Sequence, residues 1–325
     1  MAKKMVSILN ACYNEAENIP VMYKTITGIM ERLPQYDYEF LVADNCSTDN
    51  SAALLEALAA KDRRVKVILN QRNFGADRSG ANLFYHASGD VVVALASDFQ
   101  DPPEMIPLFL EKWEEGHKVV WGQREKTKSG FFQEGVRKLY YKIIKSMSEV
   151  QEIERCTGFG CYDREVVDWF KWIDDPDPFM RNTVTSLGYQ PYLIPYEQQK
   201  RRAGKSSYNF FRYLDTALIS MLATTKVPLR MVTYLGMVAA GVSILVGLVY
   251  LVLKLIYWNQ FNAGIAPLAV GLFFLGAVQL ICVGVVGEYV GAILTRVRRR
   301  PLVVARKKIN FEQEPEATAC DQSAR

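Results

Sequence analysis

The sequence predicts an α/β protein whose mostly parallel sheet carries helices on both faces, followed by an amphipathic segment and two transmembrane helices. Two observations lead to this prediction. Short apolar runs alternate with segments of helical spacing through the N-terminal part of the chain, which is typical of parallel strands joined by helices. Further along, residues 231–253 and 265–287 are uncharged apolar segments, each long enough to cross a bilayer as a helix.

The predicted strands are the short apolar runs at residues 5–12, 38–43, 65–69, 90–96 and 118–122. The predicted helices lie between and after them, at residues 15–33, 49–61, 76–88 and 102–115. In these segments apolar residues recur with helical rather than alternating spacing. Ligands of such sheets bind outside the carboxyl ends of the strands, so the informative side chains should directly follow each strand.

Polar residues do follow three of the predicted strands. They are Asn14 and Glu15 after the first, Asp44 and Asn45 after the second, and Asp98, Gln100 and Asp101 after the fourth. No glycine-rich phosphate loop follows any strand, which excludes the dinucleotide and P-loop modes of binding. Carboxylate and amide oxygens suit Mg²⁺ or Mn²⁺, which also takes substrate phosphates as ligands.

The turn at residues 98–101 therefore predicts a divalent metal site, with Asp98 and Gln100 as ligands. An alternative interpretation is that Asp98 and Asp101 are turn and N-cap residues of the helix that begins near Pro102. The chain has only two histidines, which excludes a histidine metal cage and argues against a Ser/His/Asp triad. Its net charge of +4 is too small to indicate a nucleic-acid partner.

Basic residues flank both apolar segments on the same side. Lys226 and Arg230 precede the first segment, and the second is followed by Arg296, Arg298, Arg299 and Arg300. The positive-inside rule then places both ends in the cytoplasm, and the first residues do not resemble a signal peptide. We expect an integral membrane protein with four parts. These are a cytosolic catalytic domain (1–205), an amphipathic juxtamembrane segment (206–230), two transmembrane helices (231–294) and a basic cytoplasmic tail (295–325).

A basic stretch, RRAGKSSY at residues 201–208, precedes the first apolar segment. Its cationic side chains and hydroxyls can donate to phosphate oxygens, although contact with anionic lipid headgroups is an alternative. The apolar residues after it recur at helical spacing and predict a helix at the membrane surface or one packed on the catalytic domain. Gly287 and Gly291 form a GxxxG motif, a weak indication of a homo-oligomer.

Five motifs in this order resemble the polyprenyl-phosphate glycosyltransferases of family 2, which include dolichol-phosphate mannose synthases and bacterial undecaprenyl-phosphate sugar transferases. The motifs are YNEAENI (13–19), ADNCSTD (43–49), RNFG (72–75), SDFQDPPE (97–104) and RRAGKSSY (201–208). The resemblance covers residues 5 to 300 and implies a fold of the GT-A type. It also implies inverting transfer of a sugar from a nucleotide sugar to a polyprenyl phosphate at the cytoplasmic membrane face, for cell-envelope or glycan modification. The bacterial members of this family imply a location in the bacterial inner membrane.

Roles for individual residues follow from the same resemblance. It implies that Asp44 and Asn45 bind the base and ribose of the donor, and that Asp98 and Gln100 bind Mg²⁺ or Mn²⁺. It also implies that the diphosphate of the donor contacts Arg202, Lys205 and Ser206. Asn14 and Glu15 complete the expected nucleotide-sugar site, and the residues expected to act in catalysis are Asp98, Asp101 and Arg202.

Three positions depart from the family pattern. Ala96 stands in place of the first carboxylate of an Asp-x-Asp pair, and Asn45 in place of a second aspartate. Thr157, Gly158 and Phe159 replace a Gly-Asp-Phe motif whose aspartate is a proposed base. Transfer remains feasible because a phosphate monoester is already anionic at neutral pH. Two alternatives stay open: a processive polysaccharide synthase, and a membrane-anchored nucleotide-sugar-binding scaffold with a degenerate catalytic turn.

Overall fold

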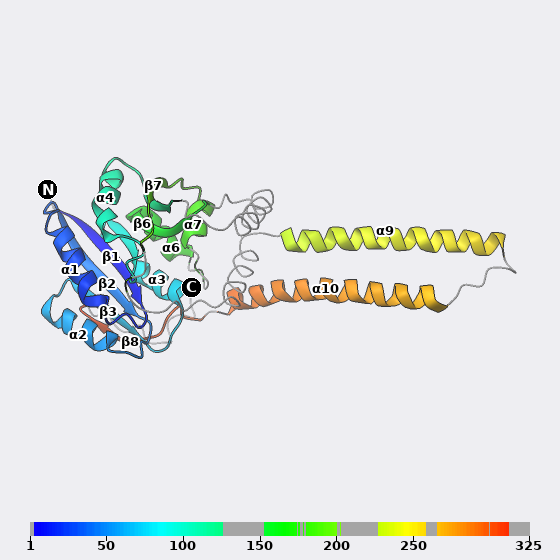
Figure 1. Ribbon diagram of the computed structural model, residues 1–325, viewed down its shortest axis with the longest axis horizontal. Coiled ribbons are helices and arrows are strands. Elements are labelled where there is room, and N and C mark those ends of the chain that lie inside the picture. The colour runs from blue at the N-terminus through cyan, green and yellow to red at the C-terminus, as the bar shows by residue number, and fades with distance from the viewer. Residues whose placement is uncertain are drawn as a thin grey trace. The chain divides into compact units, whose positions relative to one another are not determined.

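The protein is described by a computed structural model (Figure 1) that covers the following residues: 3–125, 153–173, 175, 178, 180–199, 202, 227–257, 265–298 and 300–311. The chain forms two compact units. The first consists of Met1–Gly130, Glu152–Ser207 and Arg300–Arg325, and the second of Phe131–Gln151 and Tyr208–Arg299.

An eight-stranded sheet with the order β7-β5-β6-β4-β1-β2-β3-β8 forms the centre of the first unit. Its strands are β1 (Lys4–Cys12), β2 (Tyr36–Asp44), β3 (Val65–Asn70), β4 (Val91–Ala96), β5 (Val119–Arg124), β6 (Cys156–Asp163), β7 (Tyr192–Tyr196) and β8 (Ala305–Ile309). The predicted strands are confirmed as β1 to β5. The sheet is mixed, because β6 lies antiparallel between β4 and β5, and β8 lies antiparallel to β3.

Helices cover both faces of this sheet, as predicted. They are α1 (Ile19–Met30), α2 (Ser51–Lys61), α3 (Ala76–His86), η1 (Pro103–Met105), α4 (Ile106–Glu114), α6 (Arg164–Ile173) and α7 (Met180–Ser186). Successive strand residues point to opposite faces: Ile8 packs in the core beneath α1, α2 and α4, whereas Leu9 packs in the core beneath α3, α6 and α7. Burial on both faces explains why these strands are apolar throughout rather than alternating.

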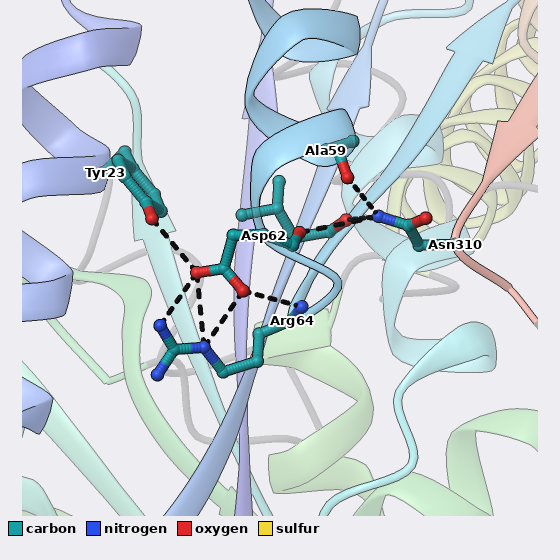
Figure 2. Close-up of polar contacts among 6 residues, drawn as sticks. Tyr23, Ala59, Asp62, Arg64 and Asn310 are labelled. Atoms are coloured by element: carbon teal, nitrogen blue, oxygen red, sulfur yellow. Dashed lines mark hydrogen bonds and ion pairs between the residues drawn. The ribbon is translucent and has the colours of Figure 1, made fainter.

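The strand β8 belongs to this sheet although it follows both long apolar helices in the chain. It pairs with β3, and Lys307 forms an ion pair with Glu56 at 2.8 Å. Figure 2 shows the next residue after β8, Asn310, whose amide donates to the carbonyl oxygens of Ala59 (2.7 Å) and Val65 (2.8 Å). Asn310 thus pairs the Ala59 carbonyl in the last turn of α2, where carbonyls lack an intrahelical partner, and the carbonyl of the first residue of β3. The expected tail at 295–325 is therefore not entirely a tail, because backbone pairing with β3 makes residues 305–309 an edge strand.

The second unit contains two long helices, α9 (Val227–Ile256) and α10 (Ile265–Val297). Within them, Met231–Ile256 and Phe274–Leu294 are long and apolar enough to cross a membrane, as the sequence predicts. Gly287 and Gly291 lie on α10. Most of the expected amphipathic segment, residues 206–226, lies outside the described residues, as do residues 312–325 of the tail.

Candidate active site

Three neighbouring strands, β4, β1 and β2, end at the same level of the sheet. Cys12 lies opposite Asp44, and Ala11 lies opposite Ala96. Each strand is followed by a loop that contains a non-glycine residue with positive φ: Asn14 (56°), Cys46 (61°) and Phe99 (60°). Such residues are uncommon and gather at functional sites, where surrounding contacts hold the backbone in place. The carboxyl edge of the parallel strands is therefore the candidate active site.

Hydrogen bonds join the loops after β1 and β2 to each other. The side-chain oxygen of Asn14 accepts the backbone N–H of Thr48 at 2.7 Å, and the N–H of Asn14 donates to the Ser47 hydroxyl at 2.9 Å. Ser47 in turn donates its backbone N–H to the fully buried carboxylate of Asp44 at 3.2 Å. The N–H of Glu15 donates to the Ser51 hydroxyl at 3.0 Å. The predicted residues Asn14, Glu15 and Asp44 are thus brought into one network.

The same network contains Asp49, which the sequence analysis did not single out. Burial raises the pKa of Asp49, but hydrogen bonds from the side chain and backbone of Ser51 and from the Ala16 N–H outweigh it, and the pKa lies below its ordinary value. Asp49 is therefore held in its charged form. Its hydrogen bonds fix the start of α2 against the loop that follows β1.

The side chain of Asn45 forms hydrogen bonds with the end of β3 and the loop that follows it. Its oxygen accepts the N–H of Phe74 at 2.9 Å and the amide of Asn70 at 3.2 Å, and its amide donates to Asn73 at 2.9 Å. This loop carries Arg72, whose guanidinium lies 4.1 Å from the centre of the Phe74 ring. A direct contact between Asn45 and a nucleotide would have to replace these hydrogen bonds, so the geometry assigns Asn45 first to holding the loop.

The turn after β4 begins with a buried hydroxyl and ends in a buried carboxylate. The Ser97 hydroxyl donates to the Ala11 carbonyl at 2.8 Å and to the Asn10 side chain at 2.6 Å. Asp98 and Gln100 are half-buried, and the Asp98 carboxylate accepts the N–H of Gln100 at 3.1 Å. Among the described residues no cluster of three His, Cys, Asp or Glu side chains could hold a metal ion. Asp98 and Gln100 contribute a carboxylate and a side-chain amide oxygen to this turn, and oxygen atoms of these kinds are ligands of divalent cations.

Asp101 lies in a different environment from Asp98. It is buried, and one of its oxygens accepts both the Tyr196 hydroxyl and an Arg124 guanidinium N–H, the latter at 3.1 Å. The N-cap position of η1 is Pro102, with no side-chain hydrogen bond, so the alternative that Asp101 caps this helix is wrong. Burial and the hydrogen bond to Asp101 raise the pKa of Tyr196 well above its ordinary value, which keeps its hydroxyl protonated and able to donate.

The start of the basic stretch lies beside this turn. The N–H of Gln199 donates to the Gln100 carbonyl at 3.1 Å, and the N–H of Arg202 donates to the Asp98 carbonyl at 3.4 Å. The exposed guanidinium of Arg202 lies 5.7 Å from the centre of the Phe99 ring. The structure thus brings Arg202 to the predicted metal turn. The other predicted phosphate contacts, Lys205 and Ser206, lie outside the described residues.

The chain is similar in sequence to known glycosyltransferases. Residues 7–170 match the family described as Glycosyl transferase family 2. The chain belongs to glycosyl transferase family 2. It is 33% identical over 303 residues to the SfII prophage-derived bactoprenol glucosyl transferase of Shigella flexneri, covering 93% of this chain and 97% of that protein. It is 29% identical over 303 residues to the prophage bactoprenol glucosyl transferase homolog of Escherichia coli (strain K12), covering 93% of this chain and 98% of that protein.

A solved mannosyltransferase from Pyrobaculum calidifontis, in complex with GDP-Man and Mn²⁺, is similar with a TM-score of 0.46 and 18% identity. The similarity covers 69% of this chain and 64% of that one. Family membership makes this protein a glycosyltransferase. The mixed sheet with helices on both faces is the GT-A-like fold that the resemblance implies.

In this glycosyltransferase, the backbone at position 158 disfavours a carboxylate side chain. Gly158 has φ +88°, and a Cβ placed there would lie 3.2 Å from the Tyr162 hydroxyl. That hydroxyl donates to the Gly158 carbonyl at 2.7 Å. An aspartate at this position would be strained by the positive φ and crowded by Tyr162. Any catalytic scheme must therefore work without a base at residue 158.

Sequence reasoning missed two side chains of the glycosyltransferase site, Arg124 and Tyr196. Arg124 ends β5, and the rule that informative residues follow strands would have found it if the strand had been extended beyond residue 122. Tyr196 ends β7, a strand that was not predicted, and no local pattern marks it. It became visible only through its contact with Asp101.

Proposed function

We propose that this glycosyltransferase transfers a sugar from a nucleotide sugar to a polyprenyl phosphate, with inversion at the anomeric carbon. The observation that carries the donor half is the placement of Arg202 against the turn that contains Asp98. A residue with a carboxylate able to hold a metal and a residue with a guanidinium able to hold phosphate are thus in backbone contact at the carboxyl edge of the sheet. This combination suits the diphosphate of a nucleotide sugar.

The largest chemical requirement is to stabilise negative charge on the departing nucleoside diphosphate. The Arg202 guanidinium can donate two hydrogen bonds to phosphate oxygens and balance part of that charge. Asp98 and Gln100 would hold Mg²⁺ or Mn²⁺, which supplies further positive charge at the diphosphate. Lys205 and Ser206 follow Arg202 in the chain, and we assign them further phosphate contacts.

The loops after β1, β2 and β3 bind the base and ribose of the donor. Asn14, Glu15 and Asp44 form one hydrogen-bonded network there, so a ligand meets a site that is already ordered. Asn45 holds the neighbouring loop, which presents Arg72 against Phe74. Preorganisation of this kind reduces the entropy that binding would otherwise cost.

The acceptor half of the proposal is supported by two observations. Relatives that align over nearly the whole chain are bactoprenol glucosyl transferases, and bactoprenol is a polyprenol. Two helices of this chain are long and apolar enough to reach a lipid acceptor in a membrane. The basic residues that flank these helices favour a cytoplasmic location for the site, in the inner membrane of a bacterium.

The acceptor does not need a base at position 158. A phosphate monoester has a second pKa of about 6, so at neutral pH its oxygen is already a negatively charged nucleophile. The oxygen forms a bond to the anomeric carbon as the bond from that carbon to the nucleoside diphosphate breaks. Attack from the face opposite the leaving group inverts the configuration. Asp98 and Arg202 therefore act on the leaving group and not on a proton.

The test offers membranes that contain the protein a panel of radiolabelled nucleotide sugars, including UDP-glucose and GDP-mannose, with added polyprenyl phosphate. We expect label in the lipid extract for one donor, and its loss when EDTA is added. Membranes without the protein are the control. Label in a water-soluble polymer would indicate a processive synthase. Donor binding without any product would indicate a scaffold, and either result contradicts the proposal.

A further inference from the structure

Asp101 has no role in the reaction as proposed above, although it lies three residues from Asp98 in the same turn. Its side chain is 5% exposed and forms an ion pair with Arg124 at 3.1 Å. The Tyr196 hydroxyl donates to the same carboxylate oxygen. Tyr196 also accepts the Nε–H of Arg124 at 3.1 Å. The three side chains thus form a closed polar cluster, which we call the Asp101 cluster.

The Asp101 cluster joins three segments that are distant in sequence. Asp101 lies in the turn after β4, Arg124 ends β5, and Tyr196 ends β7. Backbone hydrogen bonds run beside the cluster: the N–H of Glu125 donates to the Tyr196 carbonyl at 2.9 Å, and the N–H of Gln199 donates to the Gln100 carbonyl at 3.1 Å. The turn and the segment that follows β7 are therefore held together at this point.

That segment leads directly to Arg202. Tyr196 anchors its beginning in the cluster, and six residues later the N–H of Arg202 reaches the Asp98 carbonyl at 3.4 Å. Movement of Tyr196 would shift the start of the basic stretch relative to the turn. The position of the Arg202 backbone relative to Asp98 is thus tied to the cluster.

Packing leaves the Tyr196 ring little freedom. Its centre lies 5.4 Å from that of Phe159. A Cβ at Gly122 would approach its Cε1 atom to 2.9 Å, so the strand β5 also presses on the ring. The hydroxyl is therefore held in one place by the packing, and the hydrogen bond to Asp101 fixes the turn to that place.

We propose that Asp101, Arg124 and Tyr196 are positioning residues for donor binding, and that they act by fixing Arg202 relative to Asp98. This inference rests on the proposed function, because it assigns the donor diphosphate to these two residues. The carboxylate of Asp101 then contacts neither the sugar nor the metal. A diphosphate that contacts both Arg202 and the metal held by Asp98 binds most tightly when the protein has already placed both groups in the bound geometry.

Two variants test the proposal, and each removes the hydroxyl of one tyrosine that donates to an aspartate. Tyr196→Phe keeps the ring and removes the hydrogen bond to Asp101. Tyr23→Phe is the matched control, because the Tyr23 hydroxyl donates to Asp62 at 3.0 Å, and Asp62 pairs with Arg64. Full-length protein in membranes is assayed with the nucleotide sugar of the radiolabelled panel that gives lipid-linked product. The measured quantities are kcat, the donor KM, the Mn²⁺ concentration for half-maximal rate, and the unfolding temperature.

We expect Tyr196→Phe to raise the donor KM and the Mn²⁺ midpoint by about 10-fold or more, the scale of one hydrogen bond to a charged group, with a smaller change in kcat. Tyr23→Phe should leave both constants unchanged, even if both variants lower the unfolding temperature equally. Equal kinetic changes in the two variants, or no change in Tyr196→Phe, would overturn the inference, because the cluster would then affect only general stability.

A double-mutant cycle with Arg202→Ala separates this inference from the proposed function. If the cluster works by placing Arg202, Tyr196→Phe should raise the donor KM much less in the Arg202→Ala background. Additive effects contradict the positioning role. Should Arg202→Ala weaken the donor while Tyr196→Phe does not, only the inference fails. Should Arg202→Ala leave the donor KM unchanged, or no donor give product, both the proposed site and the inference fail.

Discussion

Two clusters in the first unit contain an aspartate, an arginine and a tyrosine, and they differ in what they connect. In the corner beside α2, shown in Figure 2, Asp62 accepts hydrogen bonds from Arg64 and from the Tyr23 hydroxyl. Asp62 and Arg64 are two residues apart in the chain, and the Arg64 side chain is 50% exposed. The Asp101 cluster joins three separate segments, and its Arg124 side chain is 28% exposed.

The difference shows that the same residue types can stabilise a local turn or link functional segments. An ion pair between sequence neighbours with one exposed partner contributes about 0 to 1 kcal/mol, and in the α2 corner it shapes the residues between α2 and β3, where the Tyr23 hydroxyl of α1 also binds Asp62. A buried group that bridges distant elements must keep its partners, because an unpaired buried charge is costly. We therefore expect changes around the 98–101 turn to alter activity, and changes in the α2 corner to alter stability alone.

The largest effect is expected from Asp98→Asn, at the centre of the candidate site. The amide keeps the size of the side chain and can still accept the Gln100 N–H, but it lacks the charge that a hard cation prefers. Sugar transfer should fall by orders of magnitude and recover partly at high Mn²⁺, with the unfolding temperature nearly unchanged. The measurement is the rate of lipid-linked product against Mn²⁺ concentration. An unchanged midpoint and maximal rate would leave Asp98 as a turn residue only.

A smaller effect is expected from Gly122→Ala, which adds a methyl group against the Asp101 cluster. Its Cβ would lie 2.8 Å from Phe159 and 2.9 Å from Tyr196, too close for either ring to stay in place. Overpacking of this kind costs about 1 to 3 kcal/mol. We expect a lower unfolding temperature together with a raised donor KM, because Tyr196 must move. Gly28→Ala is the control, since a Cβ there meets no atom within 4 Å. A stable Gly122→Ala protein with normal kinetics would contradict this picture.

In the α2 corner, removing the Asn310 side chain should reduce stability and leave kinetics unchanged. Asn310→Gly tolerates the φ of 62° and loses the hydrogen bonds to the carbonyls of Ala59, Asp62 and Val65, at a cost of about 1 to 2 kcal/mol. Asn310→Ala should cost about 1 kcal/mol more, because alanine is strained at positive φ. Thermal unfolding of the full-length protein in detergent measures both. A changed donor KM in Asn310→Gly would show that this corner is coupled to the site.

The smallest effect is expected from Asp62→Asn, and it should depend on pH. Hydrogen bonds from Arg64 hold the pKa of Asp62 below its ordinary value of 3.8. A carboxyl group with a lowered folded pKa stabilises the fold above its unfolded pKa, and this stability is lost as the pH falls through the folded value. Wild type should therefore lose more stability than Asp62→Asn on acidification below 3.8.

At neutral pH the Asp62→Asn variant should be less stable by at most about 1 kcal/mol. The control is Asp37→Asn, because Asp37 is 60% exposed and lies 3.9 Å from Lys3. Unfolding temperatures measured across the acidic range compare the three proteins. Parallel curves for wild type and Asp62→Asn would show that Asp62 does not contribute to the acid sensitivity.

The strands and helices that position the site could be predicted because their signals are local. Apolar runs such as residues 90–96 mark strands buried on both faces, and Asp98 follows directly where such a strand ends. The strand β8 could not be predicted in this way. Arg306, Lys307 and Lys308 resemble a basic tail in sequence because they are the exposed side chains of an edge strand, and the pairing that makes the strand comes from β3.

The amino-acid sequence by itself determined the order of the first five strands and the helices that join them, the two apolar segments, and the polar residues that follow β1, β2 and β4. Periodicity and composition are properties of neighbouring residues, so the chain displays them directly. The tertiary structure alone decided what those polar residues contact. Asn45 holds the loop after β3, and Asp101 meets Tyr196 across 95 residues of chain. A buried polar group must find a hydrogen-bond partner, but packing, and not sequence distance, selects which partner is within reach.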